Sequence, residues 1–329
     1  MSIVGIIANP SAGKDIRRLV SESRFISNQE KINIIKRVIS ALIEMGIEKI
    51  LMMPDYGHLT KESIKEFDNP NLFDFLSMPV FNSEIDTTRA AKIMEDMGAK
   101  AVVTLGGDGT NRAVALGSSN LPLMPISTGT NNAFPITIEG TLAGICAAIV
   151  AKELVDHDIC APKCKRLNIY IEGELADVAL VDVAVSSKRF VGSRAIWDTS
   201  SVSDLYLAKA SPETIGLSSI GGFINPLQET DDFGIHLELD VQAKRKVMAP
   251  VIPGKLEIIG VNKFKKIEFN QPLVVSGKQC TLALDGERSI PLQENESATI
   301  HIDRGGPPVI SPQNTLQLAA AKGIFIKDY

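Results

Sequence analysis

The sequence is poor in the features that mark several large classes of protein. Aromatic residues make up only 5% of its 329 positions, and the four cysteines (Cys146, Cys160, Cys164, Cys280) lack the paired spacing of a zinc site. Positive charge is not in excess either, because the formal net charge is −5. An acidic chain is a poor match for nucleic acid or an anionic membrane as its main partner. So few cysteines in a chain of this length fit a reducing compartment.

Long hydrophobic runs are missing as well. No window reaches the roughly 18 uncharged apolar residues that a membrane-spanning helix needs. The N-terminal stretch MSIVGIIANP has no cationic flank, so it is interpreted as a first strand and not as a signal peptide. We therefore expect a cytoplasmic protein without integral membrane association and without a nucleic-acid partner. We also expect a homo-oligomer that binds small molecules.

What the chain does contain is a change of hydrophobic pattern near its middle. In residues 1–152, short apolar runs alternate with stretches of helical period, which predicts a Rossmann-like α/β domain with a parallel sheet. In residues 153–304, short alternating runs are bounded by glycine, proline or asparagine, which is typical of an all-β sandwich. The last segment, 305–329, has a helical pattern, and we expect it to return to the N-terminal domain.

Three glycine-containing loops follow predicted strands of the first domain: NPSAGK (9–14), GGDGTN (106–111) and STGTNNAFP (127–135). The carboxyl ends of parallel strands meet at one edge of an open α/β sheet, where such sheets bind ligands. Backbone N–H groups of these loops and of the following helix N-termini favour phosphate oxygens. We therefore predict a nucleotide site formed by Asn9, Pro10, Gly13, Lys14, Gly106, Gly107, Gly109, Thr110, Asn111, Thr128, Gly129, Thr130, Asn131 and Asn132.

One acid, Asp108, stands between two glycines, where small neighbours leave its carboxylate unobstructed. Asp108 is therefore the candidate for orienting or deprotonating a hydroxyl. The alternative is a structural role, in which it caps a helix that begins near Thr110. Neither standard glycine motif fits this region, because Arg112 replaces the third glycine of the dinucleotide fingerprint and Ala8 the first glycine of a Walker A loop.

A second pair of acids lies in the β half, in the segment LALDGERS. Asp285 and Glu287 are two positions apart, so they share one face if the strand continues through them. Paired carboxylates of this kind can bind magnesium through water or act as a base. Because Asp-Gly is a common hairpin dipeptide, a plain polar turn is the other interpretation.

Together these motifs resemble the superfamily of ATP-NAD kinases and diacylglycerol and sphingosine kinases. GGDGT at 106–110 is the most specific of them. NPSAGK matches the first loop of the lipid-kinase-like members, TGTNNAFP matches the second nucleotide loop, and DGE at 285–287 falls where the C-terminal carboxylate motif belongs. The resemblance covers essentially the whole chain and implies an NAD kinase/diacylglycerol kinase-like fold. Within the superfamily, IIANPSAGKDIRRLV with STGTNNAFP is most similar to the acetoin-catabolism X branch.

The resemblance implies an enzyme, a kinase that transfers a phosphoryl group from ATP to a hydroxyl with the help of Mg²⁺. It implies that Asp108 contacts the acceptor hydroxyl, and NAD or a related small metabolite is the expected acceptor, with a link to acetoin catabolism. The sequence departs from typical NAD kinases in having no GxLGFL segment and no mid-chain Asn-Glu pair, since its only such pair is Asn295-Glu296. These departures concern the identity of the acceptor.

Two other functions remain open at this point. A lipid kinase of the diacylglycerol type is favoured by TGTNNAFP, but it should have an apolar or basic face for a membrane, and the acidic sequence gives no sign of one. A non-catalytic nucleotide sensor is disfavoured because Asp108 and both acids of DGE are present. Polyphosphate is an alternative to ATP as the phosphoryl donor.

Overall fold

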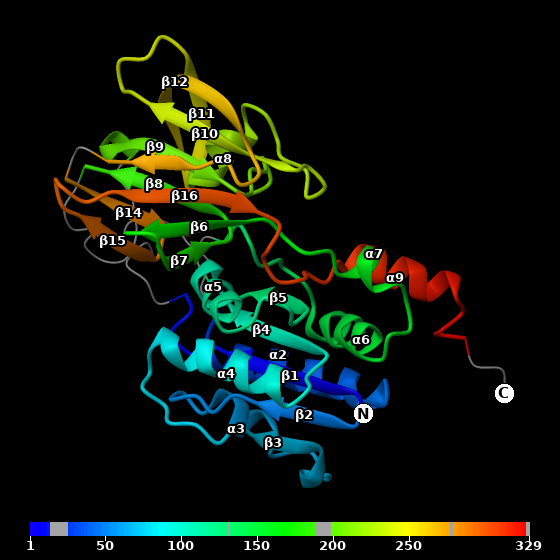
Figure 1. Cartoon of the computed structure of the whole chain (residues 1–329). Helices are drawn as coiled ribbons and strands as arrows, with labels where there is room; N and C mark the ends of the chain where they lie inside the picture. Colours follow the sequence, from blue (N-terminus) through cyan, green and yellow to red (C-terminus); the bar gives the residue numbers. More distant parts are fainter. Residues whose placement is uncertain (14–25, 130–131, 188–198, 277–278, 327–329) are drawn as a thin grey trace.

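The N-terminal part of the protein is a parallel sheet between two layers of helices (Figure 1). The structure is a computed structural model that describes residues 1–13, 26–129, 132–187, 199–276 and 279–326. The five strands lie in the order β3-β2-β1-β4-β5, and every neighbouring pair is parallel. Their bounds are Ile3–Ala8 (β1), Lys49–Met52 (β2), Phe73–Phe75 (β3), Ala101–Gly106 (β4) and Leu123–Ser127 (β5).

Capping side chains set the starts of the helices that cover this sheet. α2 (Asn28–Glu44) begins after Ser27, whose hydroxyl accepts a hydrogen bond from a backbone N–H of the first turn. α4 (Glu84–Asp96) begins with a capping box formed by Ser83 and Asp86. These caps satisfy N–H groups that the helices themselves leave without a partner.

The helices form two separate cores with the two faces of the sheet. On one face, α2 packs against α6 (Gly140–Ala151), an apolar helix that is buried over most of its length. On the other face, α4 packs against α5 (Asp108–Gly117). The short elements α3 (Leu59–Ser63) and η1 (Pro70–Leu72) connect β2 to β3.

The strand order creates a switch point between β1 and β4. From β1 the chain proceeds outward through β2 and β3, and it then returns to place β4 and β5 on the opposite side of β1. The loops that leave β1 and β4 therefore diverge and open a crevice at the carboxyl edge of the sheet. This crevice is where the loops 9–13 and 107–110 meet.

The second part of the protein is made of two antiparallel sheets that pack face to face. A seven-stranded sheet has the order β11-β12-β10-β9-β8-β14-β15, and a four-stranded sheet has the order β13-β16-β6-β7. One core lies between the sheets, and another lies between the larger sheet and α8 (Leu217–Gly222). The strand bounds are Arg166–Ile171 (β6), Glu174–Ala179 (β7), Asp182–Ser186 (β8), Val202–Leu207 (β9), Phe233–Leu239 (β10), Lys246–Ile252 (β11), Lys255–Glu268 (β12), Leu273–Val275 (β13), Cys280–Leu284 (β14), Arg288–Leu292 (β15) and Ala298–Asp303 (β16), with η3 at Thr199–Ser201.

The end of the chain lies against the first part of the molecule. Residues 308–310 bracket Leu123 of β5, with a hydrogen bond from the Leu123 N–H to the Pro308 carbonyl and one from the Ile310 N–H to the Leu123 carbonyl. α9 (Pro312–Ala321) then packs on α6 and on α7 (His157–Cys160). The fold class expected from the sequence is confirmed, whereas domain boundaries at residues 152/153 and 304/305 remain a prediction.

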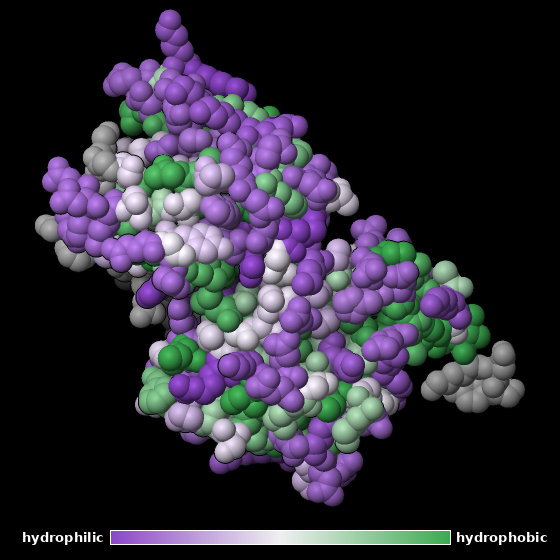
Figure 2. All heavy atoms as spheres, in the orientation of Figure 1, coloured by the Kyte–Doolittle hydropathy of each residue, from purple (hydrophilic) through white to green (hydrophobic). Residues whose placement is uncertain are grey.

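The face of the molecule shown in Figure 2 is mainly hydrophilic, with hydrophobic side chains gathered over the end that carries α9. All four cysteines are buried and free of disulfides. Within the described ranges, no helix has both the length and the apolar character needed to cross a bilayer.

Candidate functional site

A cavity of about 550 Å³ opens at the carboxyl edge of the parallel sheet, at the switch point between β1 and β4. Its wall combines the loop after β1, the turn after β2, the segment that leads into α4, and the glycine loop after β4. Only one of its described lining residues, Glu287, comes from the antiparallel half. The cavity is lined by Asn9, Pro10, Ser11, Ala12, Gly13, Met53, Pro54, Asp55, Tyr56, Val80, Asn82, Ser83, Glu84, Asp86, Thr87, Gly107, Gly109, Thr110, Ala113, Gly129 and Glu287.

A fully buried lysine holds the loop after β1. Lys31 of α2 donates hydrogen bonds to the backbone carbonyls of Asn9 (3.1 Å) and Ala12 (2.8 Å). Because the two polar groups of a trans peptide point in opposite directions, the Gly13 N–H is turned away from Lys31. The Asn9 side chain joins this loop to the glycine loop by donating to the Thr110 hydroxyl at 2.9 Å.

The glycines of GGDGT make room for protein side chains. A Cβ atom at Gly106 would overlap the side chain of Thr110, and one at Gly109 would overlap the carboxylate of Glu287. At Gly107 it would lie 2.9 Å from Asn132 Oδ1 and 3.2 Å from Glu287 Oε1. Two of the three glycines are therefore needed because an acid from the other half of the protein lies directly over them.

Asp108 occupies the first position of α5, so this helix begins two residues earlier than the sequence suggested, and Gly107 is its N-cap. The Asp108 carboxylate accepts hydrogen bonds from the N–H groups of Ala133 (3.1 Å) and Phe134 (2.8 Å). Burial raises the pKa of Asp108 to about 7, and the nearby charge of Asp285 acts in the same direction. The side chain does not line the cavity, and it ties α5 to the loop after β5.

The DGE motif is a hairpin turn, and it also reaches the site. Asp285 and Gly286 both have positive φ values, 47° and 67°, as the turn between β14 and β15 requires. The buried Asp285 carboxylate accepts hydrogen bonds from the N–H groups of Leu180 (2.9 Å) and Val181 (2.8 Å). Burial raises the pKa of Asp285 to about 6. This anchored turn carries Glu287 onto the glycine loop, so the two sequence interpretations of DGE are compatible.

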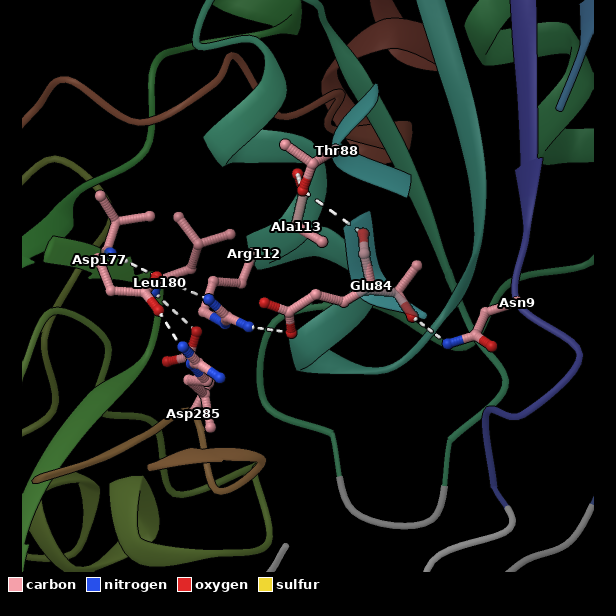
Figure 3. A network of polar contacts seen from close by, with 11 residues as sticks. Asn9, Glu84, Thr88, Arg112, Ala113, Asp177, Leu180 and Asp285 are labelled. Carbon is pink, nitrogen blue, oxygen red and sulfur yellow. Dashed lines mark hydrogen bonds and ion pairs between the residues drawn. The ribbon is translucent and has the colours of Figure 1, made fainter. Parts of the chain in front are cut away.

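A buried arginine joins the two halves next to this turn. The fully buried guanidinium of Arg112 bonds Glu84 at 2.5 Å and Asp177 of β7 at 2.6 Å. Figure 3 shows Arg112 between these two acids, with Asp285 beside it. Asp177 also pairs with Arg288, the residue that follows Glu287, at 3.4 Å. Arg112, which stands where the dinucleotide fingerprint has its third glycine, is thus the central cation of an ion-pair network between α5, α4 and β7.

The structure separates the predicted site residues into three groups. Those that line the cavity are Asn9, Pro10, Gly13, Gly107, Gly109, Thr110, Gly129 and Glu287. Those that do not line it are Gly106, Asp108, Asn111, Thr128, Asn132 and Asp285, which are all buried except the half-buried Asn132. Lys14, Thr130 and Asn131 lie outside the described residues.

Asn111 shows why some motif residues do not line the cavity. Its side chain accepts a hydrogen bond from the Thr104 hydroxyl at 2.7 Å and donates one to the Gly107 carbonyl at 2.9 Å. Both ends of the amide are used within the protein, and the residue is fully buried. It braces the glycine loop and does not face a ligand.

Several site residues were not predicted from the sequence. Asp55, Glu84 and Asp86 line the cavity, and Lys31 and Arg112 support it. Asp55 follows β2 at the same sheet edge, so the strand-end rule applied to that strand would have found it. Lys31 lies on the buried face of α2, where a lysine among isoleucines is a usable signal.

The charges of the cavity bear on whether it fits magnesium. The described lining residues include four carboxylates and no lysine or arginine. No cluster of three or more potential metal ligands occurs among the described residues. A magnesium ion held by one carboxylate, phosphate oxygens and water fits this arrangement. Of the two acids predicted as metal ligands, Glu287 lines the cavity, whereas Asp285 is engaged by backbone N–H groups.

Comparison with known proteins agrees with this architecture. Residues 4–154 match the family model of the ATP-NAD kinase N-terminal domain, and residues 165–305 match that of the acetoin catabolism protein X C-terminal domain. The acetoin catabolism protein X of Cupriavidus necator is 35% identical over 312 residues, which cover 91% of this chain and 87% of the relative. The chain belongs to the acetoin catabolism protein X family.

Solved structures of other proteins share the fold of this acetoin catabolism protein X family member. Yeast NADH kinase complexed with NADH matches with a TM-score of 0.53 at 12% identity, over 100% of this chain and 89% of that one. A candidate diacylglycerol kinase from Bacillus anthracis matches with a TM-score of 0.52 at 13% identity, over 94% and 97%. At this level of identity the likeness shows a shared fold.

Proposed function

We propose that the protein is an ATP-dependent phosphotransferase that phosphorylates a hydroxyl of NAD or of a related small metabolite, with a link to acetoin catabolism. The observation that carries the proposal is the cavity at the switch point, where Glu287 faces Gly107 and Gly109 across the boundary between the two halves. The backbone N–H groups at the start of α5, which lie beside this acid, suit the binding of phosphates next to a hydroxyl. The relatedness to acetoin catabolism protein X and the kinase fold support this reaction class.

The residues have distinct roles in this proposal. The loops 9–13 and 107–110 bind the phosphates of ATP, and Glu287 contacts the acceptor hydroxyl. The hydroxyl oxygen forms the new bond to the terminal phosphorus, the bond from that phosphorus to the ADP oxygen breaks, and Glu287 takes the proton. Magnesium, when bound, neutralises charge on the phosphates.

Asp108, expected from the sequence to contact the acceptor, is proposed to act through its neighbours. It holds the loop after β5 by its bonds to Ala133 and Phe134, and its pKa of about 7 keeps part of its population neutral near Glu287. The geometry favours Glu287 over Asp108 as the acceptor-facing acid because only Glu287 lines the cavity.

The test is the release of ADP by the full chain with ATP and Mg²⁺ over a panel of acceptors. NAD, NADH, acetoin-related diols and diacylglycerol cover the open alternatives, and polyphosphate replaces ATP in a parallel series. We expect acceptor-dependent ADP release and a phosphorylated product with a small soluble acceptor. ADP release at the background rate with every acceptor, together with unchanged binding of ATP, would instead support a nucleotide sensor.

A further inference from the structure

The hairpin of β11 and β12 presents an apolar face that no other described element covers. Met248 of β11 lies directly opposite Ile258 of β12, and Leu256 is on the same side of the hairpin two residues away. Their exposed fractions are 60%, 72% and 60% for Met248, Ile258 and Leu256. Large aliphatic side chains this exposed, and adjacent to one another, mark an interaction surface.

The opposite side of the same hairpin is an ordinary core face. Ala249, Ile259 and Val261 are buried in one hydrophobic cluster with Leu217 and Ile220 of α8. The hairpin therefore folds by burying one face, and the outer face is not needed for its stability. It lies at the end of the molecule farthest from the parallel sheet (Figure 1), so the cavity does not account for it.

Positive charge surrounds this apolar face. Residues 240–268 contain seven lysines and arginines and three acids, in a chain whose net charge is −5. Lys246 is exposed on β11, and Lys255 is exposed at the start of β12, where it pairs with Glu257 at 3.0 Å. Lys244 and Arg245 are exposed beside it, and neither forms an ion pair with a carboxylate among the described residues. The net charge of this segment is therefore positive, whereas the net charge of the whole chain is negative.

A second copy of the chain is a poor occupant for this surface. Edge-to-edge pairing through β11 is hindered by Pro250, which has no N–H to donate, and the Pro250 carbonyl already accepts a hydrogen bond from the Gly216 N–H. Face-to-face pairing about a two-fold axis would bring the basic border of one copy near the basic border of the other. An anionic partner with an apolar interior avoids both problems.

We propose that the outer face of the β11–β12 hairpin, formed by Met248, Leu256 and Ile258 within a basic border, docks on anionic lipid membranes. The aliphatic side chains enter the apolar boundary of the bilayer, and the surrounding lysines contact phosphate headgroups. The attachment is peripheral and reversible, because it uses a few side chains and no spanning element. It is independent of the reaction proposed above.

Cosedimentation of the full chain with lipid vesicles tests this. We expect binding to vesicles of phosphatidylcholine and phosphatidylglycerol in equal parts, little binding to pure phosphatidylcholine, and loss of binding at high salt. Ile258→Glu and the double variant Lys246→Glu with Lys255→Glu should each reduce the bound fraction by about tenfold. Leu142→Glu, an exposed apolar residue of α6 without this basic border, is the matched control and should bind as the unaltered chain does.

Three outcomes would overturn the proposal. One is failure of the unaltered chain to sediment with anionic vesicles at low salt. Another is a change from oligomer to monomer in Ile258→Glu by light scattering with no change in lipid binding, which would make a second copy the occupant. The third is binding to polyglutamate but not to vesicles, which would make the partner an acidic protein. Thermal unfolding of Ile258→Glu provides the folding control.

Discussion

At the scale of single residues, Glu287 and Asp108 differ in their surroundings, because Glu287 lines the cavity and Asp108 is buried. Glu287→Gln removes the cavity-facing charge with little change in shape, so turnover should fall by roughly 10² or more, the range for losing a general base. Asp108→Asn keeps an acceptor for the Phe134 N–H, so its turnover should fall by less than that of Glu287→Gln. The ratio of the two turnover rates, at matched ATP affinity, is the measurement. If the Asp108 variant lost more, the contact with the acceptor would belong to Asp108.

The pKa values of the buried acids predict how stability depends on pH. Asp108 and Asp285 have pKa values of about 7 and about 6 in the folded protein, above the usual 3.8. A raised pKa means that the folded state binds the proton more tightly, so this stability is present at low pH and lost as the pH rises from about 4 to about 7. Measured by urea unfolding, the free energy of unfolding of Asp108→Asn should fall less over this pH window than that of the unaltered chain. An equal pH dependence in the variant and the unaltered chain would contradict the raised pKa.

At the scale of elements, the ion pair between α5 and β7 connects the halves of the molecule. Removing one partner of a buried pair leaves an uncompensated charge, so Arg112→Met should cost about 3–5 kcal/mol of unfolding free energy. Replacing both partners, as in Arg112→Met with Asp177→Leu, should cost less than the single change. Urea unfolding of both variants measures this. Equal losses in the single and double variants would show that the pair contributes through packing alone.

The sequence predicted individual elements well and contacts between distant elements poorly. The strand-helix alternation gave the parallel sheet, because local hydrophobic period reports which face of an element is buried. Gly109 leaves room for a close approach to the backbone, but the approaching group, Glu287, lies 178 positions away in sequence, and its place depends on how the two halves pack. The same holds for Arg112 and Asp177, because no local pattern encodes a contact between α5 and β7.

At the scale of the whole molecule, the site requires both halves. Binding of ATP with Mg²⁺ should slow hydrogen exchange in residues 106–110 and also in residues 284–288, because Glu287 lies against the glycine loop. Mass spectrometry of exchanged peptides measures both segments in one experiment. Protection of residues 106–110 alone would show that the nucleotide site is complete without the turn.

The basic apolar hairpin also changes how the overall charge should be interpreted. The acidic composition argued against a membrane face, but that inference used an average over the chain, and residues 240–268 have the opposite sign. Binding depends on the local field near a surface and only weakly on distant charges beyond a Debye length of about 8 Å at physiological salt.

Two backbone segments connect the halves, and they run side by side. The outgoing segment at residues 162–164 and the returning segment at 306–309 are antiparallel, with hydrogen bonds between Cys164 and Pro307, between Gly306 and Cys164, and between Val309 and Pro162. The two connecting segments therefore form one paired ribbon, in which each segment holds the other by backbone hydrogen bonds. One proteolytic cut in either segment would leave the other strand as a tether.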